Sequence, residues 1–291
     1  MRLSTIAITC AAACTLAAEA PPPQPPKADA AAAAAAEATL AATRTALGGE
    51  KKLTAVKTLL ATGRTRQVRG DNLVPIEFEI AIELPDRYVR KDEIPAQESE
   101  PTTVGFNGAE LIQLPVPSLT GRGGQPTPPA ALEAARAARL ASARQDFARL
   151  TLGLFAVSFD SFPLTFSYAA KAEAPQGKAD VIDVKGPNNF TARLFISADT
   201  HLPIMIAWTP AAPQRGGPPP PSRGDAPAQA ATPPPAPPEA RIYYGDYRDA
   251  NGLTWPFRLR RALGADTVEE TTFDGFKINP KIDPKKFEVK K

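Results

Sequence analysis

Residues 76–84, with the sequence IEFEIAIEL, alternate between apolar and polar side chains, and this pattern limits the possible folds more than any other. Apolar side chains stand at every even position from 76 to 84, and glutamates stand at 77, 79 and 83. In a β-strand, successive side chains point to opposite faces, so this stretch has one apolar and one acidic face. A lone strand cannot bury such a face, so the pattern requires a sheet with something packed over it.

Similar short runs, rich in β-branched and aromatic residues, recur through most of the chain and predict a mainly β protein. Asn107-Gly108 and Asn251-Gly252 are signals for two tight hairpins. We expect ten or so strands in meander order, forming one antiparallel sheet that is curved or partly closed. The predicted strand regions are 56–68, 74–84, 86–94, 102–114, 164–172, 179–186, 190–197, 203–209, 240–248, 253–261 and 267–278.

Two alanine-rich stretches predict helices. The first begins in the alanine run after Asp29, a candidate N-cap, and ends at Gly48-Gly49. The second covers residues 128–155 and has a thin apolar stripe, which fits a helix lying lightly against a sheet.

The N-terminus predicts export. Residues 1–18 combine Arg2 with an apolar run and small residues, as signal peptides do, and cleavage after Ala18 is expected. Cys14 follows three alanines, so a lipid-modified N-terminus is the alternative. Residues 19–29 form a proline-rich spacer. Residues 30–291 then form a single domain, interrupted by a proline-rich insertion at 210–240 that we expect to be disordered.

Composition excludes several classes of chemistry. A net charge of +3 gives no reason to expect a nucleic-acid partner. Cys10 and Cys14 both lie in the signal segment, so the mature domain has no thiol, disulfide or cysteine ligand. One histidine, His201, predicted in a turn, cannot build a zinc site. A catalytic triad would need it aligned with a serine, and the sequence has no GxSxG nucleophile elbow. We therefore expect no catalytic residues, no metal and no cofactor. A hydrolase that uses paired carboxylates remains an alternative.

Several phrases occur in a telling order within 45–291: ALGGEKKLTAVKTLLATG, GFNGAELIQL, ARLFISADTHLPIMIAW, YYGDYRDANGLTWPFRLR and FKINPKIDPKKFEV. Together they resemble the LolA/LolB-like superfamily of outer-membrane lipoprotein-sorting proteins. The resemblance implies an α+β fold, mainly β with helices: a curved antiparallel half-barrel closed by an N-terminal and a central helix. The 210–240 insertion and the polar, alanine-rich helix at 128–155 depart from that pattern.

The resemblance also implies a function. We expect an exported, non-enzymatic carrier or receptor in the periplasm, soluble or lipid-anchored to the outer membrane. It would hold acyl chains of lipids or lipoproteins in a hydrophobic cavity beneath helix 128–155, and membrane-associated transport proteins could be partners. The other alternative is an envelope structural or interaction protein with a filled interior, because each candidate contact could equally be core. By strand parity, the candidate lipid contacts are Phe78, Ile80, Ile82, Ile204, Ile206, Trp208, Trp255 and Phe257.

Overall fold

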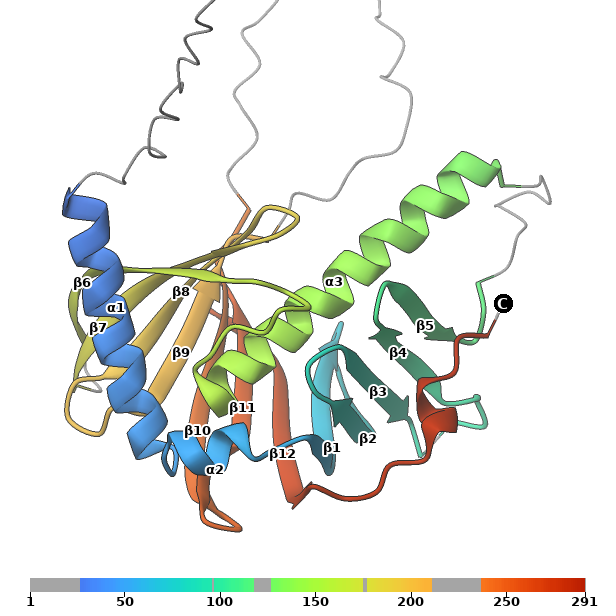
Figure 1. The fold of residues 1–291 in the computed structure, drawn as a ribbon. Helices are drawn as coiled ribbons and strands as arrows, with labels where there is room; N and C mark the ends of the chain where they lie inside the picture. Colours follow the sequence, from blue (N-terminus) through green and yellow to red (C-terminus); the bar gives the residue numbers. More distant parts are fainter. Residues whose placement is uncertain (1–26, 96, 118–126, 175–176, 211–236, 291) are drawn as a thin grey trace, which may run out of the picture.

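The computed structural model describes residues 27–95, 97–117, 127–174, 177–210 and 237–290. The predicted signal peptide, Cys14, most of the spacer and most of the 210–240 insertion lie outside these residues, so those assignments stay predictions. The described part folds as one open, curved sheet with helices on its inner side (Figure 1).

Twelve strands among the described residues form a single antiparallel sheet, which confirms the predicted mainly β, half-barrel fold. Each predicted strand region contains one strand, except that region 102–114 contains two, joined at Asn107 and Gly108. The strands are β1 Thr58–Arg69, β2 Asn72–Glu83, β3 Arg87–Glu93, β4 Thr102–Asn107, β5 Glu110–Leu114, β6 Thr165–Ala174, β7 Gly177–Gly186, β8 Phe190–Ser197, β9 Pro203–Trp208, β10 Ala240–Ala250, β11 Leu253–Leu263 and β12 Asp266–Ile278.

The strand order is two meanders joined through the first and last strands. β1 to β5 follow one another on one side, and β6 to β12 follow one another on the other. β12 pairs with β1, so that Thr65 lies opposite Thr271. The prediction of a simple meander holds within each half but misses this long-range pairing, which places β5 and β6 at the two edges.

Helix α1, Lys27–Ala46, covers the β6 side of the sheet, and the short α2, Glu50–Thr54, follows it (Figure 1). Leu40 of α1 and Leu47, directly after α1, are fully buried. The predicted stop at the double glycine is confirmed. The predicted start is wrong: Asp29 lies within the first helical turn instead of capping it, so the helix already includes residues assigned to the spacer.

Helix α3, Pro129–Phe155, crosses the inner side of the sheet (Figure 1). Its N-terminal half is exposed, whereas its C-terminal half is buried through large side chains such as Phe147, Leu152 and Phe155. The Trp255 indole Nε1 donates a hydrogen bond to the Leu154 carbonyl at 2.8 Å, which satisfies an acceptor that the helix end leaves free. The expectation of a lightly packed helix is therefore correct for the first half of α3 and wrong for the second.

A smaller apolar cluster lies on the other face of the sheet. Phe287, in the final 3₁₀ turn Pro284–Phe287, packs with Ala81, Val89 and Ile112. Because Ala81 has the opposite parity to Ile80 and Ile82, β2 contributes side chains to both clusters. The main core therefore lies between the inner face of the sheet and the helices that cover it.

Candidate binding cavity

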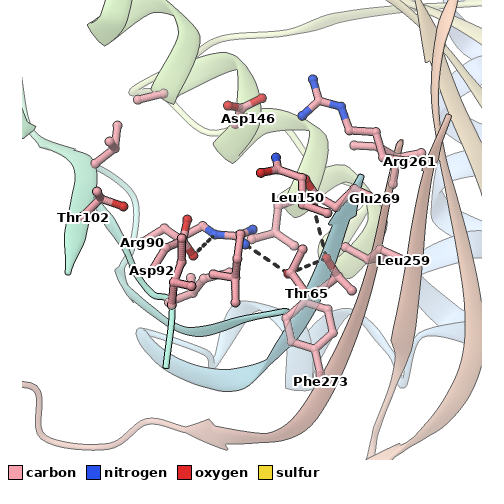
Figure 2. A pocket seen from close by; sticks show the side chains of 18 of the residues that line it. Thr65, Arg90, Asp92, Thr102, Asp146, Leu150, Leu259, Arg261, Glu269 and Phe273 are labelled. Atoms are coloured by element: carbon pink, nitrogen blue, oxygen red, sulfur yellow. Dashed lines mark hydrogen bonds and ion pairs between the residues drawn. The ribbon is translucent and has the colours of Figure 1, made fainter. Parts of the chain in front are cut away.

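A cavity of about 740 Å³ lies between α3 and the inner face of the sheet (Figure 2). This volume falls within the range of roughly 300–1,000 Å³ that is usual for small-molecule sites. Its wall draws on both meanders, since β1 to β4 contribute on one side and β10 to β12 on the other. The β1–β12 pairing therefore makes the cavity possible, because it joins the two halves of its wall.

One end of the cavity is apolar. Ile80, Tyr88, Leu259 and Phe273 line it from the sheet, and Leu150 faces it from α3. The Tyr88 ring is buried and stands 5.6 Å from the Phe147 ring. Burial raises the pKa of Tyr88, so the phenol stays neutral at physiological pH. Since this end presents mainly carbon to the cavity, it can accept an apolar group without leaving polar partners unpaired.

The floor beside this end is polar but internally satisfied. The hydroxyls of Thr65 and Thr271 form a buried hydrogen bond of 2.9 Å. Arg90 donates to the Asp92 carboxylate at 2.7 Å and to the Thr65 hydroxyl at 3.2 Å, and its guanidinium lies 4.8 Å from the Phe78 ring centroid. Burial acts to lower the pKa of Arg90, but Asp92, together with Tyr88 and Glu269, outweighs burial and leaves the Arg90 pKa above its ordinary value. Arg90 therefore remains a fixed, paired cation.

A second arginine reaches the cavity from the helix. The Arg149 side chain is only 7% exposed, and it donates to the carboxylate of Asp146 at 2.9 Å and to the Gln145 side-chain oxygen at 3.1 Å. Burial lowers the pKa of Arg149, although Asp146 opposes that effect. Arg149 also holds α3 in place through its backbone, because its carbonyl accepts a hydrogen bond of 2.7 Å from the Tyr244 hydroxyl.

Of the eight predicted lipid contacts, Ile80 lines the cavity, and it also belongs to the buried main core. Ile204 is half-buried, and the other six are buried in the main core: Phe78, Ile82, Ile206, Trp208, Trp255 and Phe257. These six side chains are buried because α3 packs against the sheet, and its aromatic residues occupy much of the half-barrel. Phe155, for example, stands 5.5 Å from Trp255, ring to ring. Parity identified the inner face correctly for the seven residues other than Ile204, but it could not identify the part of that face that α3 leaves vacant.

Sequence reasoning also missed the charged part of the lining. Arg90 and Arg261 occupy inward positions of their strands, two residues after the inward-facing Tyr88 and Leu259 respectively. A charged residue at an inward position is the signal that could have indicated a partly polar cavity. The cavity is thus amphipathic rather than hydrophobic throughout.

Two further observations concern chemistry and membranes. Within the described ranges, no three histidine, cysteine, aspartate or glutamate side chains lie close enough together to hold a metal ion. His201 lies in the turn between β8 and β9 with a φ of 57° and is exposed, which confirms its predicted place. Among the helices of the described residues, none has the length and apolar character needed to cross a bilayer.

Comparison with known proteins identifies the architecture. No protein-family model matches the sequence, and no curated protein matches it at a significant level. A solved LolA superfamily protein from Nitrosomonas europaea aligns with 87% of this chain and 97% of its own, with a TM-score of 0.50 and 11% identity. The chain has a LolA-like fold. This confirms the fold that the sequence phrases implied, and at such low identity it shows the fold alone.

Two other solved structures each align with 87% of this chain and 97% of their own. A domain described as an outer-membrane lipoprotein-sorting protein from Vibrio parahaemolyticus gives a TM-score of 0.47 at 8% identity. A DUF1329 family protein from Desulfovibrio piger gives 0.45 at 7%.

Proposed function

We propose that the protein is an exported, non-enzymatic carrier or receptor that binds the acyl chain of a lipid or lipoprotein. The observation that carries the proposal is the cavity beneath α3, in a sheet with a LolA-like fold. The tail lies at the apolar end, between Leu150 of the helix and Ile80 and Phe273 of the sheet.

The energetics suit a reversible carrier. Burial of about eight methylene groups at about 0.8 kcal/mol each contributes roughly 6 kcal/mol. Association itself costs an estimated 4–15 kcal/mol or more, so a short tail alone binds weakly and a longer or better-held ligand binds usefully. The N-terminal half of α3, residues 129–142, has no fully buried side chain, so moving it would break few core contacts. The C-terminal half is held by its buried side chains. The chain enters beneath the exposed half.

The place of action follows from the signal segment, which directs the protein to the periplasm. There it is soluble or anchored to the outer membrane through Cys14, and membrane-associated transport proteins are its expected partners. The intact mass of protein purified from its native envelope distinguishes these forms. Cleavage after Ala18 gives an unmodified N-terminus, and an acylated Cys14 adds the mass of its acyl groups.

The alternatives have less support. A structural protein with a filled interior would have no use for a cavity of this size. A carboxylate hydrolase needs acids free to exchange protons with a substrate. Three of the four acids in the lining instead accept hydrogen bonds: Asp92 and Asp146 from arginines, at 2.7 and 2.9 Å, and Glu269 from the Thr271 hydroxyl at 3.3 Å.

Native mass spectrometry of the envelope-purified protein, followed by extraction, tests the proposal. We expect a co-purifying acyl-chain lipid or lipoprotein. The variant Leu150→Trp fills the apolar end and should lose that ligand. Leu132→Trp makes the same exchange on the same helix outside the cavity lining and should keep it. A wild-type protein free of lipid that binds no added fatty acid would refute the proposal.

A further inference from the structure

The inner face of the sheet changes from apolar to charged along the cavity. On β12, the inward residues run from Phe273 through Thr271 to Glu269, and on β11 they run from Leu259 to Arg261. The two gradients are in register, because Leu259 lies opposite Thr271 and Arg261 lies opposite Glu269. A molecule that matches this wall has an apolar tail at the Phe273 end and a polar head at the Arg261 end.

One N–H group of the Arg149 guanidinium has no hydrogen-bond acceptor among the described residues. Its side chain is 93% buried, and its two terminal nitrogens donate to Asp146 and Gln145. Its Nε atom is buried and has no hydrogen-bond partner among the residues that the structure describes. An unpaired donor on a buried cation is costly. Arg149 lines the cavity, so a cation whose donors the described residues do not all satisfy stands in the cavity wall.

Arg261 brings a second cation to the same place. Figure 2 shows it reaching from β11 towards α3 and Asp146. The guanidinium carbons of Arg149 and Arg261 lie 4.1 and 5.6 Å from the ring centroid of Trp208. Arg261 forms no ion pair with any described residue, and the carboxylate of Glu269 across from it accepts from Thr271 instead. Two cations thus converge at one indole, and the ion-paired carboxylate of Asp146 balances one of them.

We infer that Arg149 and Arg261, the arginine pair, bind the anionic oxygen headgroup, carboxylate or phosphate, of an amphiphile whose acyl tail fills the apolar end. Guanidinium groups match both anions because their N–H donors form planar forks. The inference rests on the proposed function and adds the chemical class of the ligand. Since one arginine belongs to α3 and the other to β11, the headgroup would also tie the helix to the sheet.

The test uses the full chain and ligands that share one tail. Calorimetry compares dodecanoate, dodecyl phosphate, dodecanol and dodecyltrimethylammonium, all below their micellar concentrations, with inorganic phosphate as the tail-free arm. We expect the two anionic amphiphiles to bind at least tenfold more tightly than dodecanol, and the cationic one to bind most weakly. Inorganic phosphate should bind far more weakly than dodecyl phosphate.

Charge variants locate the effect, with matched controls on the same strands. Arg261→Gln should remove the advantage of anionic heads and weaken dodecanol binding much less. Glu269→Gln should have the opposite sign and tighten anionic binding by roughly two- to fivefold, because it removes a neighbouring negative charge. Arg258 and Glu270 form an exposed ion pair at 3.0 Å on β11 and β12, outside the cavity lining. Arg258→Gln and Glu270→Gln make the same charge changes and should alter neither ligand class.

The outcomes separate the two ideas. If dodecanol binds as tightly as dodecanoate, and Arg261→Gln changes neither, the headgroup inference is overturned while the acyl-chain carrier stands. If no tailed ligand binds but inorganic phosphate binds through Arg261, the source of the anion is free phosphate and the carrier proposal fails. If nothing binds, both fail.

Discussion

The replacement of Gly153 by alanine tests how α3 is held against the sheet. A Cβ atom at this position would stand 2.8 Å from Cδ1 and Cζ of the Tyr244 ring, and closer still to Cε1. The ring cannot swing aside freely, because its hydroxyl donates to the Arg149 carbonyl at 2.7 Å and the side chain is buried. The substitution must therefore move either the helix or the ring.

The sign of the change in unfolding free energy shows whether Tyr244 obstructs the new methyl group. In an ordinary helix, glycine to alanine stabilises by about 1 kcal/mol. Here, overpacking costs about 1–3 kcal/mol, and loss of the Tyr244 hydrogen bond costs a further 0.5–1.5 kcal/mol. We expect Gly153→Ala to lower the free energy of unfolding by roughly 0.5–3.5 kcal/mol.

Urea unfolding of the full chain measures this change, with the slope m checked for constancy. The double variant Gly153→Ala with Tyr244→Leu removes the obstructing ring and serves as the control, since alanine should then be tolerated better than in the wild-type background. If Gly153→Ala stabilises the protein by about 1 kcal/mol, as in an ordinary helix, α3 does not pack closely against Tyr244.

Two more predictions concern the same core. Trp255→Phe leaves the Leu154 carbonyl without its hydrogen-bond donor. In the same urea assay, this should lower the free energy of unfolding by about 1–3 kcal/mol. An unchanged free energy would mean that this hydrogen bond does not hold α3. Burial raises the pKa of Tyr88, Tyr244 and Tyr247 above the value of about 10 for unfolded tyrosine. Their contribution to stability is therefore full below pH 10 and lost as the pH rises towards the folded-state values, so urea midpoints should fall above pH 10. Tyrosinate absorbance should rise together with unfolding; ionisation of all tyrosines in the folded protein would contradict this.

The strands were predictable because alternation is a local property. The run at 76–84 needs no distant partner to be recognised as a strand, and β2 covers nearly all of it. The pairing of β1 with β12 joins residues more than 200 positions apart, such as Thr65 and Thr271, and no local pattern records it. The fold class could therefore be predicted from the sequence, and the strand order only in part.

The cavity was the least predictable feature. Ile80 and Ile82 share one face of one strand, so parity treats them alike. Both are buried, but Ile80 lines the cavity, whereas Ile82 lies opposite Tyr88, whose ring packs against Phe106 and Phe147. Which inward side chain remains free to line a cavity depends on how α3 packs, and the alanine-rich sequence of that helix suggested a looser contact than its second half makes.

Photo-crosslinking with a fatty acid that carries a diazirine near the end of its tail shows where the acyl chain binds. We expect saturable labelling that dodecanoate competes away and that peptide mass spectrometry maps to the segments containing Ile80, Leu150 and Phe273. Labelling that is not saturable, or that falls on the exposed half of α3 and the outer face of the sheet, would contradict an acyl chain bound between the helix and the sheet.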